Sequence, residues 1–285
     1  MSYDDLLGRV VTLSVRRFSS PGAFLALEVE DPRPEAPTLL LPGAEIPEGT
    51  REGDALEVFV YLDSEDRPIA TMRTPRLTLG RVAFLAVTDV TRIGAFVDWG
   101  LQKELLVPHA EQTRDVLVGD RHPIGLYLDP SRRLAGTMRV TEMLRALGEF
   151  ELDEWVEGEA WRKDPELGLF VIVEQRFVGL VPATEPTTLG RGDAARFRVA
   201  TVLEDGKIEL SLRGHAHEEV DKDAQRILAR LAQPGTPRVG DRSSPEEIRA
   251  VFGLSKKAFK RAVGKLLKER AVTIDAQGFL LLQRR

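Results

Sequence analysis

The feature that most constrains this chain is a unit of about seventy residues that occurs three times. Each copy carries four landmarks in the same order: the glycine of a Gly-x-Phe tripeptide, a proline that ends an apolar run, the glycine of a Gly-Asp pair, and a final arginine. These landmarks are Gly22, Pro42, Gly53 and Arg73 in the first copy, Gly94, Pro108, Gly119 and Arg139 in the second, and Gly168, Pro182, Gly192 and Arg213 in the third. The first glycine and the proline are 14 residues apart in copies two and three and 20 apart in copy one, where the proline-rich stretch 30–37 accounts for the surplus.

Each copy contains about five short runs rich in Val, Leu and Phe, separated by Gly, Pro and Asp turns. Examples in the first copy are 10–15, 23–27 and 56–62. Short runs at this spacing predict small antiparallel barrels rather than helices. We therefore expect a multidomain, mainly β protein, with three tandem five-stranded OB-type barrels and a small α+β winged helix-turn-helix domain. The expected domains are barrel 1 at 1–75, barrel 2 at 76–141, barrel 3 at 142–213, a linker at 214–242 and the winged helix at 243–285.

Two connectors are expected to be helical. Residues 142–150 predict a short helical spacer that leads into barrel 3. Residues 216–232 place apolar side chains near helical spacing between charges, which predicts an amphipathic linker helix. The stretch 233–240 then contains two prolines and two glycines and predicts a domain boundary.

The C-terminal segment has the signals of a winged helix. Ser244-Pro-Glu-Glu247 combines a capping serine, a proline at the first helical position and a glutamate three residues after the cap. A glycine turn, a basic helix over 256–270 and two short strands at 272–274 and 279–282 follow. Six basic residues on this second helix are candidate nucleic-acid contacts, the alternative being an ordinary solvated face; they are Lys256, Lys257, Lys260, Arg261, Lys265 and Lys268.

The net charge of −5 conceals a strong asymmetry along the chain. Residues 1–75 carry −7 and residues 142–213 carry −6, whereas residues 76–141 carry +2 and residues 243–285 carry +6. Because phosphates are repelled by acidic surfaces, we expect barrel 2 and the winged helix to make the principal nucleic-acid contacts.

Several motifs indicate a known family. The Gly-x-Phe tripeptides, the Leu-Val-Pro strands, the Gly-Asp turns and the terminal arginines resemble the RNA-binding OB barrel of ribosomal protein S-one. More closely, residues 91–100 (TRIGAFVDWG), with Leu-Leu-Val-Pro at 105–108 and Glu-Gln at 111–112, resemble the conserved virulence factor B family. This resemblance covers nearly the whole chain. It implies three such barrels and a winged helix in a bacterial, cytoplasmic, RNA-binding regulator of gene expression with no known catalytic activity.

The S-one barrel pattern also implies contact residues. Its base-stacking aromatic corresponds to Phe24, Phe96 and Phe170, although the alternation of residue types leaves open whether these rings lie in the core. Its acidic residue with a basic one four positions later corresponds to Asp63/Arg67 and Asp129/Arg133, and copy three offers Glu204 and Lys207, one residue shorter. In barrel 2 we expect four cations to contact phosphate: Arg92, Lys103, Arg132 and Arg133.

Two positions depart from that pattern in every copy. A second aromatic, three residues before the first, is replaced by Pro21, Ile93 and Leu167, and a histidine is replaced by Pro42, Pro108 and Pro182. Each barrel should therefore bind weakly by itself. Affinity would come from several weak modules on one chain.

Other kinds of chemistry have little support. The chain has no cysteine, no phosphate-binding glycine loop and no nucleophile elbow. His215-x-His217 offers two metal ligands without a third, so we expect no metal, no cofactor and no catalysis. No apolar run reaches the length of a membrane span and the N-terminus is acidic, so we expect a cytoplasmic protein.

On these grounds we expect single-stranded RNA to be the partner. Two alternatives stay open. The acidic barrels can serve as a scaffold for a protein partner, or the winged helix can read duplex DNA.

Overall fold

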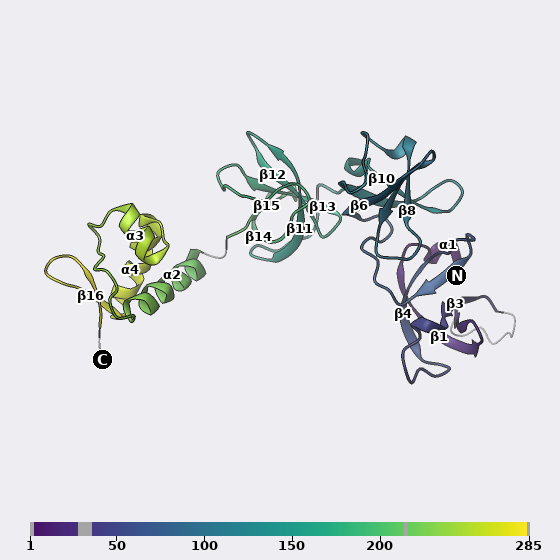
Figure 1. Cartoon of the computed structure of the whole chain (residues 1–285), viewed down its shortest axis with the longest axis horizontal. Coiled ribbons are helices and arrows are strands. Elements are labelled where there is room, and N and C mark those ends of the chain that lie inside the picture. Colours follow the sequence, from purple (N-terminus) through teal and green to yellow (C-terminus); the bar gives the residue numbers. More distant parts are fainter. Residues whose placement is uncertain (1–2, 28–35, 214–215, 284–285) are drawn as a thin grey trace. The chain divides into compact units, whose positions relative to one another are not determined.

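The computed structural model describes residues 3–27, 36–213 and 216–283, with the backbone alone for 216–219. The chain divides into two compact units, Met1–Leu210 and Ser211–Arg285 (Figure 1). The first unit holds three five-stranded barrels and the second a small helical domain with a two-stranded hairpin. The predicted fold class is therefore confirmed.

Barrel 1 is closed and has the strand order β1-β2-β3-β5-β4, with β3 and β5 parallel and the other pairs antiparallel. A short helix α1 (Tyr3–Leu6) precedes it and a 3-10 turn (Gly43–Glu45) follows β3. Its strands are β1 (Val10–Ser19), β2 (Gly22–Ala26), β3 (Thr38–Pro42), β4 (Ala55–Leu62) and β5 (Pro68–Thr71).

Barrels 2 and 3 repeat this arrangement. In barrel 2 the sheet order is β10-β9-β6-β7-β8, and barrel 3 closes in the order β11-β12-β13-β15-β14. The strands of barrel 2 are β6 (Val82–Val90), β7 (Gly94–Asp98), β8 (Leu105–Pro108), β9 (Arg121–Leu128) and β10 (Leu134–Thr137). Those of barrel 3 are β11 (Trp155–Asp164), β12 (Gly168–Val173), β13 (Phe177–Pro182), β14 (Ala194–Val202) and β15 (Ile208–Ser211).

The sequence landmarks have structural causes. The glycine of each Gly-x-Phe pairs with the proline that ends the following strand: Gly22 with Pro42, Gly94 with Pro108 and Gly168 with Pro182. All three glycines have positive φ, and a Cβ on them would lie 2.0–2.2 Å from a carbonyl oxygen of the neighbouring strand. Only glycine allows the two backbones to approach so closely.

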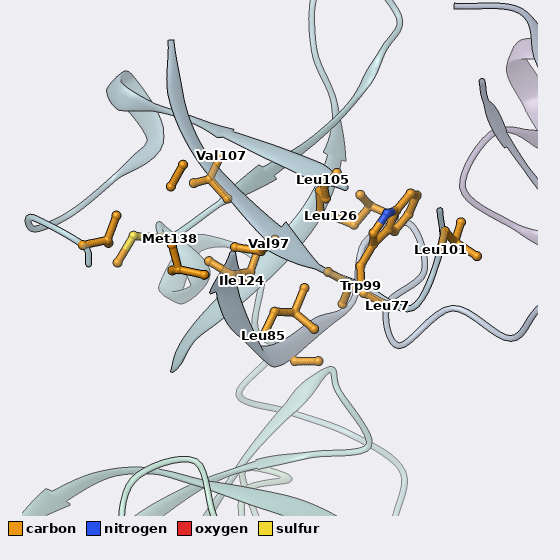
Figure 2. Packing of buried hydrophobic residues seen from close by; sticks show 14 of the residues in the cluster. Leu77, Leu85, Val97, Trp99, Leu101, Leu105, Val107, Ile124, Leu126 and Met138 are labelled. Atoms are coloured by element: carbon orange, nitrogen blue, oxygen red, sulfur yellow. The ribbon is translucent and has the colours of Figure 1, made fainter. Parts of the chain in front are cut away.

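Barrel 2 shares its core with part of barrel 1. Phe59 and Tyr61 of β4 join a buried cluster that includes Trp99, Leu85 and Ile124 of barrel 2. Figure 2 shows side chains of this cluster gathered between the strands. Because the two barrels bury apolar side chains together, they are held as neighbours within the first unit.

The second unit consists of α2 (Ala216–Leu231), α3 (Pro245–Phe252), α4 (Lys256–Lys268) and the hairpin β16 (Val272–Ile274)–β17 (Leu280–Leu282). The predicted capping box forms, since the side chain of Ser244 accepts from the Glu247 N–H and the Glu247 carboxylate accepts from the Ser244 N–H. Gly253 ends α3 in the left-handed conformation, with φ of 68°. Helix, turn, helix and hairpin form the expected winged helix.

The predicted linker helix forms, but it belongs to the second unit and does not stand apart from it. The α2 helix forms, but Ile227 and Ala224 are buried in one core with Phe252 and Phe259 of α3 and α4. The Leu280 N–H also donates to the Val239 carbonyl. The stretch 233–240 is therefore a loop inside the second unit and not a domain boundary, because the apolar face of α2 is covered by that unit's own helices.

The prediction of a helical spacer at 142–150 is wrong. Only a 3-10 turn, Val140–Glu142, forms at its start, and residues 144–150 are not helical. The Arg145 N–H donates to the Arg176 carbonyl and the Val178 N–H donates to the Arg145 carbonyl. These bonds pair Arg145 with the backbone at the start of β13, so tertiary pairing overrides the helix propensity of a short stretch.

Candidate nucleic-acid interface

The phenylalanine of each Gly-x-Phe lies on the outer face of its barrel. In barrel 2, Ala95 and Val97 on either side of Phe96 are 2% and 0% exposed, whereas the ring of Phe96 is only partly buried. Phe24 and Phe170 occupy the same place in β2 and β12. The alternation along each strand directs the flanking residues inward, so the rings face outward.

The three rings differ in what covers them. In barrel 1 the guanidinium carbon of Arg17 lies 3.8 Å from the Phe24 ring centroid, and in barrel 3 that of Arg162 lies 4.1 Å from the Phe170 centroid. Both arginines sit opposite their phenylalanine on the adjacent strand, directly after a bulge. The same bulge in barrel 2 places Asp89 opposite Phe96. Among the described residues, no guanidinium lies over the Phe96 ring.

Phe96 borders a hollow of about 290 Å³ where barrel 2 meets the β4–β5 turn of barrel 1. Its apolar part includes Ile93, which is 61% exposed, and Trp99, whose indole Nε1–H donates to the Lys103 carbonyl at 2.6 Å. Its charged rim consists of Lys103, Arg133, Asp66, Asp129 and Glu104. An aromatic ring that lines one hollow with two cations is suited to a nucleotide, since the base can stack on the ring and the cations can contact phosphate.

Both cations are currently paired with barrel 1. The Lys103 ammonium donates to the Asp63 carbonyl at 2.6 Å and to the Asp66 carboxylate at 3.0 Å, and Arg133 lies 3.7 Å from the same carboxylate. The hydrogen bond from Lys103 and its positive charge hold the pKa of Asp66 below its usual range. Because all three side chains are partly exposed, the pairs are weak enough for a phosphate to compete.

Three further predicted contacts lie in turns. Arg67 pairs with Asp63 at 2.8 Å and with Glu65 at 2.8 Å. Although desolvation acts to raise it, hydrogen bonds from Arg67 hold the pKa of Asp63 below its usual value. Arg67 therefore stabilises its own turn.

The other two are Arg92 and Arg132. Arg92 is exposed between β6 and β7, close in sequence to Ile93. Arg132 pairs with Asp4 at 3.3 Å. The structure thus brings Lys103 and Arg133 to the hollow of Phe96, whereas Arg132 is turned toward the N-terminal helix.

Barrel 3 presents an apolar version of the same face. A hollow of about 330 Å³ is lined by Phe170, Trp161, Leu144 and Leu203, among others. The Leu203 N–H donates to the Lys207 carbonyl, as the Asp129 N–H does to the Arg133 carbonyl. Leu203 therefore occupies the position of the aspartate, and the pairing of Glu204 with Lys207 inferred from the sequence is wrong. Hydrogen bonding across the turn, rather than residue type, sets the alignment.

The basic residues of α4 fall into two sets. Three are engaged within the unit: Lys256 donates to the Ser243 carbonyl at 3.0 Å, Lys260 pairs with Asp241 at 3.0 Å, and Lys265 pairs with Asp221 and Glu269. The other three are exposed on one side of the helix and are defined here as the α4 stripe: Lys257, Arg261 and Lys268. Their spacing of four and seven residues aligns them for phosphates.

Sequence reasoning missed Arg17, Asp89 and Arg162, the residues opposite the three rings. They precede their phenylalanines by seven, seven and eight residues, so the extra residue in the third hairpin hides the correspondence. A comparison of the three copies strand by strand would have shown arginine, aspartate and arginine at one position.

Metal sites and membrane-spanning helices were looked for in the described part of the chain. Among the described residues, no group of three or more His, Asp or Glu side chains is placed to hold a metal ion. His215 and His217, for which we expected no metal, lie outside the residues whose side chains are described. No helix in the described part of the chain is long and apolar enough to cross a membrane.

Comparison with known proteins supports the barrel and winged-helix domain types. The family model described as S1 domain matches residues 7–73 and 79–139, and the one described as CvfB-like winged helix domain matches residues 225–281. Both are nucleic-acid-binding types of domain. Barrel 3 has the strand order of barrel 1.

Relatives match along most of the chain. An uncharacterized protein, YitL of Bacillus subtilis (strain 168), is 32% identical over 276 residues, covering 93% of this chain and 90% of the relative. Conserved virulence factor B of Staphylococcus saprophyticus is 28% identical over 242 residues, 81% of each chain. A crystal structure of a multidomain protein with nucleic acid binding domains from Streptococcus pneumoniae is 26% identical, with a TM-score of 0.42, and covers 98% of this chain and 99% of that one.

Proposed function

The chain belongs to the conserved virulence factor B family, and on that premise we propose that it is a non-catalytic protein that binds single-stranded RNA and regulates gene expression after transcription. Barrel 2 makes the base contact. The winged helix adds phosphate contacts. The protein acts in the cytoplasm of a bacterium.

The observation that carries this proposal is the half-buried ring of Phe96, which has no arginine over it among the described residues and lines one hollow with Lys103 and Arg133. Every base has a flat face, so stacking on an exposed aromatic ring binds single strands whatever their sequence. In a duplex the base faces are already stacked on each other. The site is therefore better suited to a single strand than to a double helix.

The net charge of each segment supports different roles for the modules in RNA binding. Barrel 2 carries +2 over residues 76–141, whereas the segments of barrels 1 and 3 carry −7 and −6. The α4 stripe adds three cations on the basic C-terminal module. Since the modules share one chain, binding of the first raises the effective concentration of the second, and weak sites give useful affinity together.

The test is a fluorescence-polarisation titration of the whole protein at several salt concentrations. The ligands are a nine-nucleotide single-stranded RNA, the matching single-stranded DNA and the matching DNA duplex. We expect the RNA to bind best, with an affinity that falls steeply as salt rises, because phosphate contacts release counterions. Absence of RNA binding at low salt would refute the proposal, and preference for the duplex would favour a DNA-reading winged helix.

The contribution of the α4 stripe is tested in the same assay. Replacing Lys257, Arg261 and Lys268 together by Gln removes three potential phosphate contacts and should reduce the slope of log affinity against log salt by about 2. The matched control replaces three exposed cations of α2 and α3, Lys222, Arg226 and Arg249, by Gln. An equal change in both variants would mean that only net charge matters, and the stripe would have no particular role.

A second candidate function rests on barrel 3. Its hollow is apolar where that of barrel 2 is charged, and Leu203 at its edge is 41% exposed. An exposed apolar hollow on an acidic barrel suits a protein partner better than a nucleic acid. Loss of partner capture in a Leu203→Asp variant, with RNA binding unchanged, would support this scaffold role.

A further inference from the structure

A hollow of about 580 Å³ within the first unit is lined by residues of all three barrels and their connectors. It is named here the arginine hollow, after Arg9, Arg81, Arg145 and Arg176, which line it together. We infer that the arginine hollow binds a compact anion with several charges, namely a chain of two or three phosphates. It shares no lining residue with the hollow of Phe96, so the inference goes beyond the proposed RNA binding.

The four arginines come from different parts of the first unit. Arg9 directly precedes β1 of barrel 1, and Arg81 directly precedes β6 of barrel 2. Arg145 lies in the segment that leads from barrel 2 into barrel 3, and Arg176 lies in the turn between β12 and β13. One ligand in this hollow would therefore contact all three barrels.

The main chain holds these arginines at the hollow. The Arg145 N–H donates to the Arg176 carbonyl at 2.8 Å, and the Leu126 N–H donates to the Arg81 carbonyl at 3.1 Å. The Arg81 guanidinium also donates through Nη1 to the Glu174 carbonyl at 2.9 Å, which directs it toward barrel 3. Because the backbone makes the pairing between Arg145 and Arg176, glutamine at these positions can keep it.

The positive charges of the arginine hollow lack counter-charges from the protein. Within the described part of the chain, none of the four arginines forms an ion pair, and no Asp or Glu is among the residues that line the hollow. Desolvation, followed by the charges of Arg145 and Arg81, lowers the pKa of Arg176 below its usual value. An anion would relieve this repulsion, and the planar fork of a guanidinium matches the oxygens of a phosphate.

The surroundings of the arginine hollow favour a compact ligand over a nucleic-acid strand. Arg81 also lines a neighbouring hollow that contains Glu157, Glu159 and Glu174, so a strand leaving in that direction would meet three carboxylates. The segments of barrels 1 and 3 carry −7 and −6. No aromatic side chain is among the described residues that line the arginine hollow, so a base would find no ring on which to stack.

The experiment is isothermal titration calorimetry of the full-length protein at constant ionic strength, set with chloride. The probes are tripolyphosphate, pyrophosphate, inorganic phosphate and ATP. We expect one site per chain and affinities that decrease from tripolyphosphate to pyrophosphate to phosphate, because a longer chain reaches more guanidinium groups. ATP that binds as tightly as tripolyphosphate would support a nucleotide as the source of the phosphates, and weaker binding of ATP would support a free polyphosphate.

The test variant carries Arg145→Gln and Arg176→Gln, and it should bind tripolyphosphate about tenfold more weakly or worse, since two charged hydrogen-bonding groups are lost. The matched control carries Arg51→Gln and Arg114→Gln, which remove the same charge from exposed positions outside the hollow. Its affinity should stay within about twofold of the unchanged protein. Melting followed by circular dichroism verifies that both variants fold.

Both variants are also titrated with the nine-nucleotide RNA in the polarisation assay, and we expect them to bind it equally. A loss of RNA affinity in the test variant as large as its loss for tripolyphosphate would place the arginine hollow on the RNA-binding surface and overturn the inference. Absence of tripolyphosphate binding, or equal losses of that binding in test and control, would overturn it as well. RNA binding that still depended on Phe96 would keep the proposed function intact in each of these cases.

Discussion

Barrel 2 and its two neighbours share strand order, bulge and the Gly–Pro close approach, yet differ at the one position opposite the phenylalanine. Arginine covers the ring in barrels 1 and 3, and aspartate leaves it open in barrel 2. The shared positions have backbone constraints that every copy must meet. The exposed position has none, and substitutions there change stability little. Repeats of one fold can therefore acquire different binding properties without changing their backbone arrangement.

Truncating each ring in turn tests most directly whether the three barrels differ in RNA binding. Phe96→Ala should weaken RNA binding by about tenfold or more, because base stacking contributes roughly 1–3 kcal/mol per ring. Phe24→Ala and Phe170→Ala should change it little, since their rings are already covered by arginine. The measurement is the polarisation titration, with circular dichroism to verify folding. Equal losses of RNA affinity in the three variants would show that an arginine over a ring does not prevent a base from stacking on it.

A second test transfers the arginine to barrel 2. Asp89→Arg should cover Phe96 as Arg17 covers Phe24, and a base would have to displace a cation–π contact worth about 0.5–1 kcal/mol. Because the added charge itself attracts RNA, the comparison is with Asp115→Arg, which makes the same change in charge away from the ring. We expect the first variant to bind RNA about three- to fivefold more weakly than the second. Equal affinities would indicate that the ring is not the binding surface.

The contact between barrels 2 and 3 can be tested through Glu159. This carboxylate accepts from the Phe84 N–H at 3.0 Å, and desolvation by burial raises its pKa above the usual glutamate value. The folded protein therefore keeps the proton to higher pH than the unfolded chain does. The stability that this group contributes is present below the unfolded pKa and is lost as the pH rises through the folded pKa.

Glu159→Gln keeps the acceptor for Phe84 and removes the charge. We expect its melting temperature to depend less on pH between about pH 4 and pH 8 than that of the unchanged protein, with a gain in stability of about 1 kcal/mol or less at the upper end. Differential scanning fluorimetry across this range checks it. Identical pH profiles would show that Glu159 has no effect on stability in this range.

The smallest expected effect concerns the contact between barrels 1 and 2. Asp66→Asn removes the ion pairs to Lys103 and Arg133, which are exposed enough to contribute at most about 1 kcal/mol. RNA affinity should rise about twofold at low salt. The control is Asp4→Asn, which breaks the pair with Arg132 outside the hollow. A larger rise in RNA affinity for the control would indicate that the RNA phosphates contact Arg132 rather than Lys103 and Arg133.

Much of the architecture could be predicted because its causes are local. Gly94 and Pro108 mark a close approach of two strands, and Ser244 and Glu247 mark a helix start, whatever surrounds them. The spacing of such landmarks is enough to recognise three barrels and a winged helix. The role of individual cations could not be predicted in the same way, since Lys103 and Arg67 look alike in sequence and differ only in whether their partners come from their own turn.

The sequence alone determined the repeat, the type of each module and the charge of each segment. Only the tertiary structure decided that no arginine covers Phe96, that Asp66 of one barrel reaches the cations of the next, that α2 belongs to the second core and that residues 144–150 are not helical. The reason is physical. Each of these depends on contacts between residues that are distant in sequence. The residue opposite Phe96 is also set by a bulge that shifts which side chains face each other across two strands.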